Sequence, residues 1–136
     1  MNVSFSLVGA GNGGGMLENS GATVAINDLL LQSHAGHLRF FPVWDATILG
    51  ASSFTTLRTY GAFLVSASIS GTGTVAPISL VSEQGETVVF ESPWAEGVVP
   101  VVTETQSGQK IQVSKKPGDL WAFETHKAGQ YKIVQS

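Results

Sequence analysis

From residue 38 onward, apolar and polar residues alternate in short runs separated by turn-forming residues. Alternation rich in Val, Thr and aromatic residues is typical of half-buried strands. Runs spaced about ten residues apart, with no helix between them, favour an antiparallel sandwich. We therefore predict a mainly β fold, an antiparallel β-sandwich of about eight or nine strands with one N-terminal α-helix. The expected strands are Leu38–Phe41, Phe54–Thr59, Ala62–Ser70, Val75–Ser82, Thr87–Phe90, Val98–Thr103, Lys110–Val113, Leu120–Glu124 and Tyr131–Val134.

Turn signals lie between these runs. Gly71-Thr72-Gly73 predicts a tight hairpin between two of the longest strands. Further glycine-containing turns are predicted at Gln84-Gly85, Ser107-Gly108, Pro117-Gly118 and Ala128-Gly129.

Only the segment from Ala22 to Ser33 has helical periodicity, with Asn19 or Ser20 as its N-cap and Gly36 as the residue that ends it. Apolar residues surround most of this helix, so it requires neighbours on more than one side. We expect its exposed face to be covered by self-association into a homo-oligomer. The predicted division places a glycine-rich loop and helix in residues 1–36 and the sandwich in residues 37–136.

The glycine-rich stretch that begins at Gly9 fits the dinucleotide fingerprint G-x-G-x-x-G. A Rossmann unit also requires a following helix, a parallel strand and an acidic residue about twenty positions further on. Here the helix starts late, Asp45 lies roughly thirty positions past Gly14, and no further strand–helix units follow. The stretch therefore indicates a flexible loop, and neither a nucleotide nor any other cofactor is predicted.

Composition excludes several partner classes. Charged residues make up only 12% of the 136 residues, about half the ordinary share, so the chain hides much of its surface or is part of something larger. The net charge of −3 provides no basic patch for nucleic acid. No apolar run has the length of a membrane span, and the N-terminus does not resemble a secretory signal. The chain has no cysteine, so cysteine usage indicates neither an oxidising nor a reducing compartment.

No constellation for catalysis or metal binding emerges from the residues alone. Most acids fall among strands and turns, but Glu18 precedes the helix, where it could favour the helix dipole or project into a cleft. His34 and His37 flank the predicted helix end and His126 is remote, so no metal site is predicted and His34 is assigned to the helix terminus. No serine lies in a G-x-S-x-G elbow.

Three tryptophans, Trp44, Trp94 and Trp121, are the remaining candidates. Exposed aromatic rings can stack on sugars, so carbohydrate is a possible partner. However, Trp44 ends an apolar run and Trp94 follows a strand, positions from which a large ring can wedge between two sheets. Packing is therefore the favoured role.

The chain also carries motifs of a known family. Two stretches come close together in the chain: Glu18-Asn19-Ser20-Gly21-Ala22-Thr23 and Ile26-Asn27-Asp28-Leu29-Leu30-Leu31-Gln32-Ser33-His34. Together they resemble the last barrel helix of glycoside hydrolase family 95. That family includes the α-L-fucosidases and is similar to related uncharacterised bacterial glycosidases. The similarity continues through Leu38–Trp44, Leu57–Val65, Ser82-Glu83-Gln84-Gly85 and Ser92-Pro93-Trp94. It covers about residues 13 to 94.

The resemblance implies a part of a larger enzyme. Such enzymes carry an N-terminal β domain, an (α/α)₆ barrel with the active site and a C-terminal β domain, and this chain matches only the end of the barrel and the β domain after it. In the fucosidases, an acidic residue before the turn that precedes this helix takes part in catalysis. Asn19 aligns with the family's Asn, but Leu17 stands where the acid would be and Glu18 comes one position later. The shift implies a different substrate for any active parent.

The resulting hypothesis is a non-catalytic C-terminal β domain that supports a missing barrel, without enzyme activity of its own. Its candidate substrate-binding residues are Glu18, Asn19, Trp44 and Trp94. The alternative is a free-standing carbohydrate-binding module that uses Trp44, Trp94 or Trp121 as its stacking surface. A module needs at least one solvent-facing tryptophan, whereas a packing domain needs none.

Overall fold

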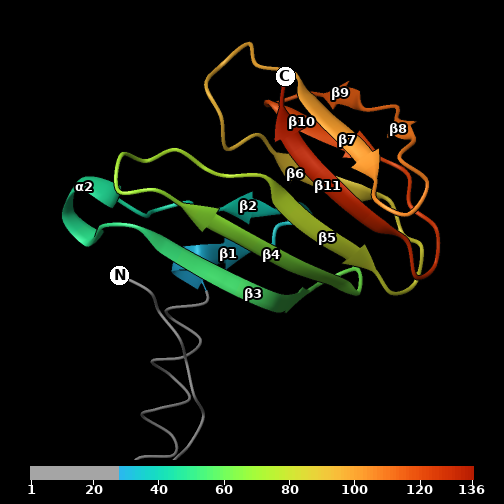
Figure 1. Cartoon of the computed structure of the whole chain (residues 1–136), viewed down its shortest axis with the longest axis horizontal. Helices are drawn as coiled ribbons and strands as arrows, with labels where there is room; N and C mark the ends of the chain where they lie inside the picture. The colour runs from blue at the N-terminus through green and yellow to red at the C-terminus, as the bar shows by residue number, and fades with distance from the viewer. Residues whose placement is uncertain (1–27) are drawn as a thin grey trace, which may run out of the picture.

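The alternating runs form two facing β-layers in the computed structural model, which describes residues 28–136 (Figure 1). Residues 28–30 are helical, and strands and one short helix come after them. In chain order these elements are β1 Leu31–Gln32, β2 Arg39–Phe40, α2 Ala46–Leu49, β3 Ser52–Thr59, β4 Phe63–Ile69, β5 Ile78–Ser82, β6 Val88–Glu91, β7 Pro100–Glu104, β8 Lys110–Ile111, β9 Ser114–Lys116, β10 Leu120–Phe123 and β11 Gln130–Gln135.

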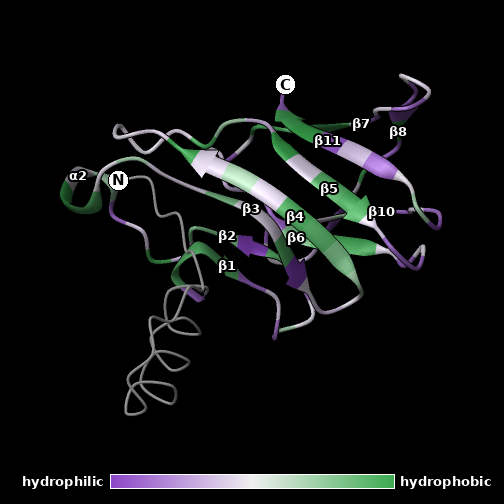
Figure 2. Cartoon of the chain, turned by 60° about the horizontal axis from the view of Figure 1, so that its bottom comes forward, coloured by the Kyte–Doolittle hydropathy of each residue, from purple (hydrophilic) through white to green (hydrophobic). Residues whose placement is uncertain are grey.

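One layer is a six-stranded antiparallel sheet in the order β3-β4-β5-β11-β7-β8. Along β4, Phe63, Val65, Ala67 and Ile69 are buried, while the residues between them are only half-buried. The same alternation, which follows from the two-residue period of a strand, is visible as bands of hydropathy along β4, β5 and β11 (Figure 2). The core therefore lies on one face of this sheet.

The other layer combines the antiparallel sheet β6-β10-β9 with the ribbon β1-β2. Leu38, just before β2, joins the two, because its amide donates to the Val89 carbonyl and its carbonyl accepts from the Glu91 amide. A chain of aromatic rings fills the space between the layers. Phe90 and Phe123 lie 6.1 Å apart between ring centroids, and Phe123 and Tyr131 of the facing sheet lie 5.5 Å apart.

The predicted mainly β sandwich is confirmed, but the predicted end of the N-terminal helix at Ser33 is wrong. Leu31 and Gln32 pair with Phe40 and Arg39 instead, since the chain turns back into the ribbon β1-β2. Gly36, expected to end the helix, closes that turn with a φ of 82° and a hydrogen bond from its amide to the Ser33 carbonyl. The segment 22–27, including most of the predicted exposed helix face, lies outside the described residues.

Two elements had no counterpart in the prediction. Helix α2 begins after Asp45, whose carboxylate caps it by accepting from the Thr47 amide at 3.0 Å. All three residues of strand β9 are exposed, and the strand pairs with β10 at a sheet edge, so it has no apolar alternation. Within residues 28–136, no helix is long and apolar enough to cross a bilayer.

The predicted hairpin at Gly71-Thr72-Gly73 connects β4 to β5. The Gly73 amide donates to the Ser70 carbonyl, and the Ser70 amide donates to the Thr74 carbonyl. Regular pairing in β5 nevertheless starts at Ile78 rather than at Val75, which forms only an isolated bridge with Ile69. The hairpin thus ends in an irregular arm.

Candidate functional site

The residues predicted to bind a substrate are not brought together in one site. Glu18 and Asn19 lie outside the described residues, so their role stays a prediction. Trp44 lies in the loop before α2, and Trp94 lies in the loop between β6 and β7. Both indoles are half-buried and pack against the core.

Trp44 is fixed by the backbone around α2. Its indole N–H donates to the Gly50 carbonyl at 2.9 Å, which ties the loop before the helix to the residue after it. The Asp45 carboxylate also accepts from the Thr47 side chain, and this hydrogen bond holds the pKa of Asp45 below its ordinary range. These contacts support the packing role predicted for Trp44.

Trp94 and Trp121 line one groove of about 310 Å³ beside the β6–β7 loop. We call it the tryptophan groove and define it by Trp94, Trp121, Glu91, Glu96, Lys115 and Asp119. The Trp94 indole N–H donates to the Val75 carbonyl at 3.0 Å, whereas in the described part of the chain the Trp121 indole N–H donates to no other residue. The Lys115 ammonium lies 5.7 Å from the Trp121 ring centroid.

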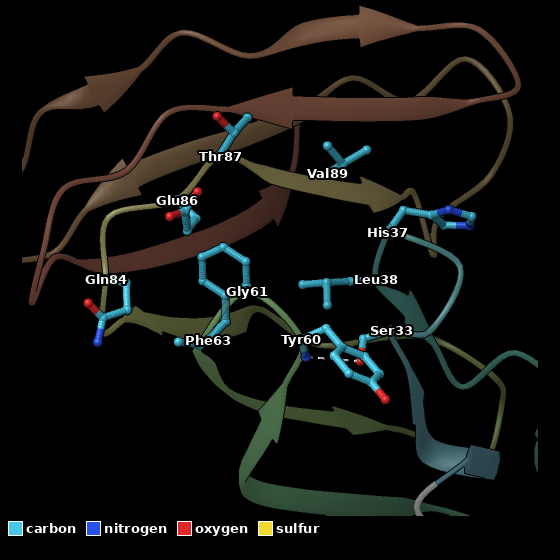
Figure 3. A pocket seen from close by; sticks show the side chains of 12 residues that line it. Ser33, His37, Leu38, Tyr60, Gly61, Phe63, Gln84, Glu86, Thr87 and Val89 are labelled. Atoms are coloured by element: carbon cyan, nitrogen blue, oxygen red, sulfur yellow. Dashed lines mark hydrogen bonds between the residues drawn. The ribbon is translucent and has the colours of Figure 1, made fainter.

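A larger cavity of about 480 Å³ opens at the end of the sandwich where the β1–β2 turn, the β3–β4 turn and the β5–β6 loop meet. In this end cleft, Leu38, Phe63 and Val89 form an apolar floor between the two layers (Figure 3). Tyr60 lies at the rim with 74% of its surface exposed, and its amide donates to the Ser33 hydroxyl at 3.2 Å.

The polar side chains around the end cleft do not form a catalytic pair. His37, Glu86 and Ser33 all line it, but no hydrogen bond joins any two of these side chains within residues 28–136. General acid–base and nucleophilic catalysis both need such groups within hydrogen-bonding reach. The cleft in this form therefore offers an apolar recess with a polar rim.

Glu104 and His126 form an ion pair in which each group shifts the pKa of the other, and sequence reasoning did not bring them together. The pairing of β11 with β7 aligns Tyr131 with Glu104 and so places the β10–β11 loop beside the end of β7. One Glu104 carboxylate oxygen accepts from the Ser107 hydroxyl, and the other contacts Nε2 of His126. The signal for this pair in the sequence is Glu104 itself, because it occupies an inward position of β7, where a carboxylate requires a partner.

Each member shifts the titration of the other. Hydrogen bonds from Ser107 and then from His126 hold the pKa of Glu104 below its ordinary value. The hydrogen bond to Glu104 raises the pKa of His126 above its ordinary value of 6.5. The pair is thus a charged imidazolium–carboxylate contact in mildly acidic solution.

This pair makes the stability of the domain depend on pH. The raised pKa of His126 adds stability that is complete below pH 6.5 and is lost as the pH rises through the pKa in the folded state. The lowered pKa of Glu104 adds stability that is present above its ordinary value of 4.5 and is lost as the pH falls through its folded value. The urea midpoint of the unmodified chain should therefore decline between about pH 6 and pH 9, the range in which histidines titrate. We expect a smaller decline in His126→Gln, which lacks the titrating imidazole.

The matched control is Ser107→Ala, which removes only the contact of the serine hydroxyl with Glu104. The substitution should bring the pKa of Glu104 closer to its ordinary value, so the loss of stability in acid should begin at a higher pH. The decline of stability at alkaline pH should persist. An unchanged alkaline slope in His126→Gln would show that the pair does not control this titration.

Among the described residues, no three His, Asp or Glu side chains come together in a way that could hold a metal ion. The three histidines are used separately: His34 is exposed, His37 lines the end cleft, and His126 contacts Glu104. No protein-family model matches the chain, and no curated protein sequence matches it significantly.

Proposed function

We propose that this chain is the non-catalytic C-terminal β domain of a glycosidase similar to family 95, and that it supports a catalytic α-helical barrel. The observation that carries the proposal is that residues of the resembling motifs hold the sandwich together. Arg39 donates to Glu91 at 2.8 Å and Arg58 donates to Glu83 at 2.5 Å, so both arginines cross-link elements of the sandwich. Phe63 is buried in the core.

A surface suited to a protein neighbour surrounds α2. Val43, Ile48 and Leu49 are 61%, 80% and 37% exposed, and we call these three residues the α2 patch. Large apolar side chains that are exposed within a few residues of one another are typical of a protein contact. Val43 belongs to Leu38–Trp44, a segment that carries the resemblance, and Ile48 and Leu49 follow this segment closely, so we propose that the barrel covers the patch.

The alternative, a free-standing carbohydrate-binding module, differs in what it requires of the tryptophans. Trp44 and Trp94 are half-buried, pack against the core and donate their indole N–H groups to backbone carbonyls, which favours the supporting role for these two residues. We also propose self-association, because without a barrel copies of the chain would cover one another's apolar surfaces. Sedimentation of the chain at several concentrations measures its oligomeric state.

The proposal predicts that the transcript upstream of Met1 encodes a helical barrel in the same frame. In the longer protein, Ile48→Glu should lower the stability of the junction by about 2 kcal/mol, because it places a charge in a buried contact. In the chain of residues 1–136 the same change should alter stability by less than about 0.5 kcal/mol, because Ile48 is exposed there. Thermal unfolding of both proteins measures the difference.

The matched control is Gln106→Glu, which adds the same charge to an exposed turn between β7 and β8, on the opposite side of the molecule from α2 (Figure 1). It should leave both proteins unchanged. An upstream stop codon with no barrel frame, or equal effects of Ile48→Glu in the short and long proteins, would contradict the proposal.

A further inference from the structure

We propose that the tryptophan groove binds a neutral saccharide. In this site the Trp121 ring is the stacking surface, and the charged side chains on the walls hydrogen-bond to sugar hydroxyl groups. The inference rests on the groove alone and not on the proposed parent enzyme, so the two can fail separately.

Strand register explains why an aromatic ring reaches the surface here. Trp121 pairs with Phe90 on one side and with Lys115 on the other, and paired residues of antiparallel strands lie on the same face. Phe90 is fully buried, and Phe123, two residues along β10, is buried on that face as well. Trp121 therefore continues the core row toward the open edge of the sandwich, where it is only half-buried.

The hydrogen-bonding state of the two indoles assigns them different roles. The Trp94 N–H is used by the Val75 carbonyl, so this ring is held as a wall of the groove. The Trp121 N–H has no acceptor within residues 28–136, which leaves a donor for a ligand. A half-exposed indole with a free donor combines an apolar face with a polar edge, as sugar rings require.

The charges on the walls select for a neutral ligand. Most of these charges are already paired, so the walls attract neither an anion nor a cation strongly. Arg39 lies 2.8 Å from Glu91. The Lys115 ammonium lies 3.9 Å from the Asp119 carboxylate and 5.7 Å from the centre of the Trp121 ring, where it also keeps a second cation away. A polyhydroxylated ring can use both the carboxylate acceptors and the ammonium donor, and it adds no charge.

The volume of about 310 Å³ is at the lower end of the range for small-molecule sites, roughly 300–1,000 Å³. The site therefore suits a short stretch of sugar units. The β6–β7 loop, which projects beside the C-terminus in Figure 1, supplies one wall of the groove.

The test titrates the full chain with cellotetraose, xylotetraose and mannotetraose, and follows backbone amide shifts by NMR. Tetragalacturonic acid and a glucosamine tetramer serve as the anionic and cationic probes. We expect at least one neutral probe to shift amides of the β6–β7 loop and of Lys115–Trp121 saturably, and to bind more tightly than either charged probe.

Two substitutions locate the contact. Trp121→Ala should weaken binding about tenfold or more, through loss of the stacking surface. Since this variant also removes a packing residue, Lys115→Ala provides the second measurement: its side chain is 61% exposed, the fold should be unaffected, and binding should weaken about threefold. The matched control Lys116→Ala, on the other face of β9, should bind like the unmodified chain.

The proposal is wrong if no neutral probe binds, if a charged probe binds more tightly than every neutral one, or if Lys115→Ala and Lys116→Ala bind equally well. None of these outcomes bears on whether a barrel is encoded upstream or covers the α2 patch.

Discussion

Phe90→Ala is expected to lower the free energy of unfolding by about 3–5 kcal/mol, which is a large share of the stability of a domain of this size. Phe90 is fully buried, and its ring centroid lies 6.4 Å from that of Phe40 and 6.1 Å from that of Phe123. Truncation would leave a cavity where the ribbon, the three-stranded sheet and the six-stranded sheet meet. Urea denaturation followed by circular dichroism measures the loss.

The control for this prediction is Tyr60→Ala, another aromatic truncation, at a residue that is 74% exposed. It should change stability by about 0.5 kcal/mol or less. If Phe90→Ala cost no more than Tyr60→Ala, the two layers would not share the aromatic core described above.

Gly85→Ala is expected to destabilise the domain by more than about 2 kcal/mol, for two additive reasons. Gly85 has a φ of 84°, a left-handed conformation that costs a residue with a side chain about 1–2 kcal/mol. A Cβ there would also lie 2.8 Å from the backbone nitrogen of Lys127, so the β10–β11 loop would have to move. The Gly85 amide, which donates to the buried Ser82 hydroxyl at 3.0 Å, would be displaced with it.

Gly108→Ala separates the two causes. Gly108 also has a left-handed φ, 70°, but its Cβ would meet nothing within 4 Å. Only the conformational cost of about 1–2 kcal/mol is therefore expected. Equal urea midpoints for the two variants would show that the β5–β6 and β10–β11 loops are not packed against each other.

Alternation predicts the sandwich because most strands have one buried face and one exposed face. It fails where that contrast is missing. Leu31 is buried in a two-residue strand too short to show a period, so the helical spacing of the sequence extends across it. All three residues of β9 are exposed, so its pairing with β10 leaves no apolar pattern.

The functional surfaces are less predictable, because each depends on contacts between distant parts of the chain. Trp94 and Trp121 are both candidates from the sequence, but they lie on a loop and on a strand that are distant in the chain, so their shared groove is not predictable from it. Glu104 and His126 are 22 positions apart, and only the pairing of β11 with β7 brings them together. The cap at Asp45 is readable in principle, since an Asp before a short apolar segment is a common helix start.

The central proposal is that this β domain packs against a helical barrel through the α2 patch. Its most direct test is amide hydrogen exchange at Ile48 and Leu49, whose N–H groups donate to the Asp45 carbonyl in a single exposed helical turn. A helix this short is marginal without tertiary cover, so these amides should exchange quickly in residues 1–136. We predict exchange at least about tenfold slower in the longer protein that includes the upstream coding sequence. Equal rates in the two proteins would contradict the account.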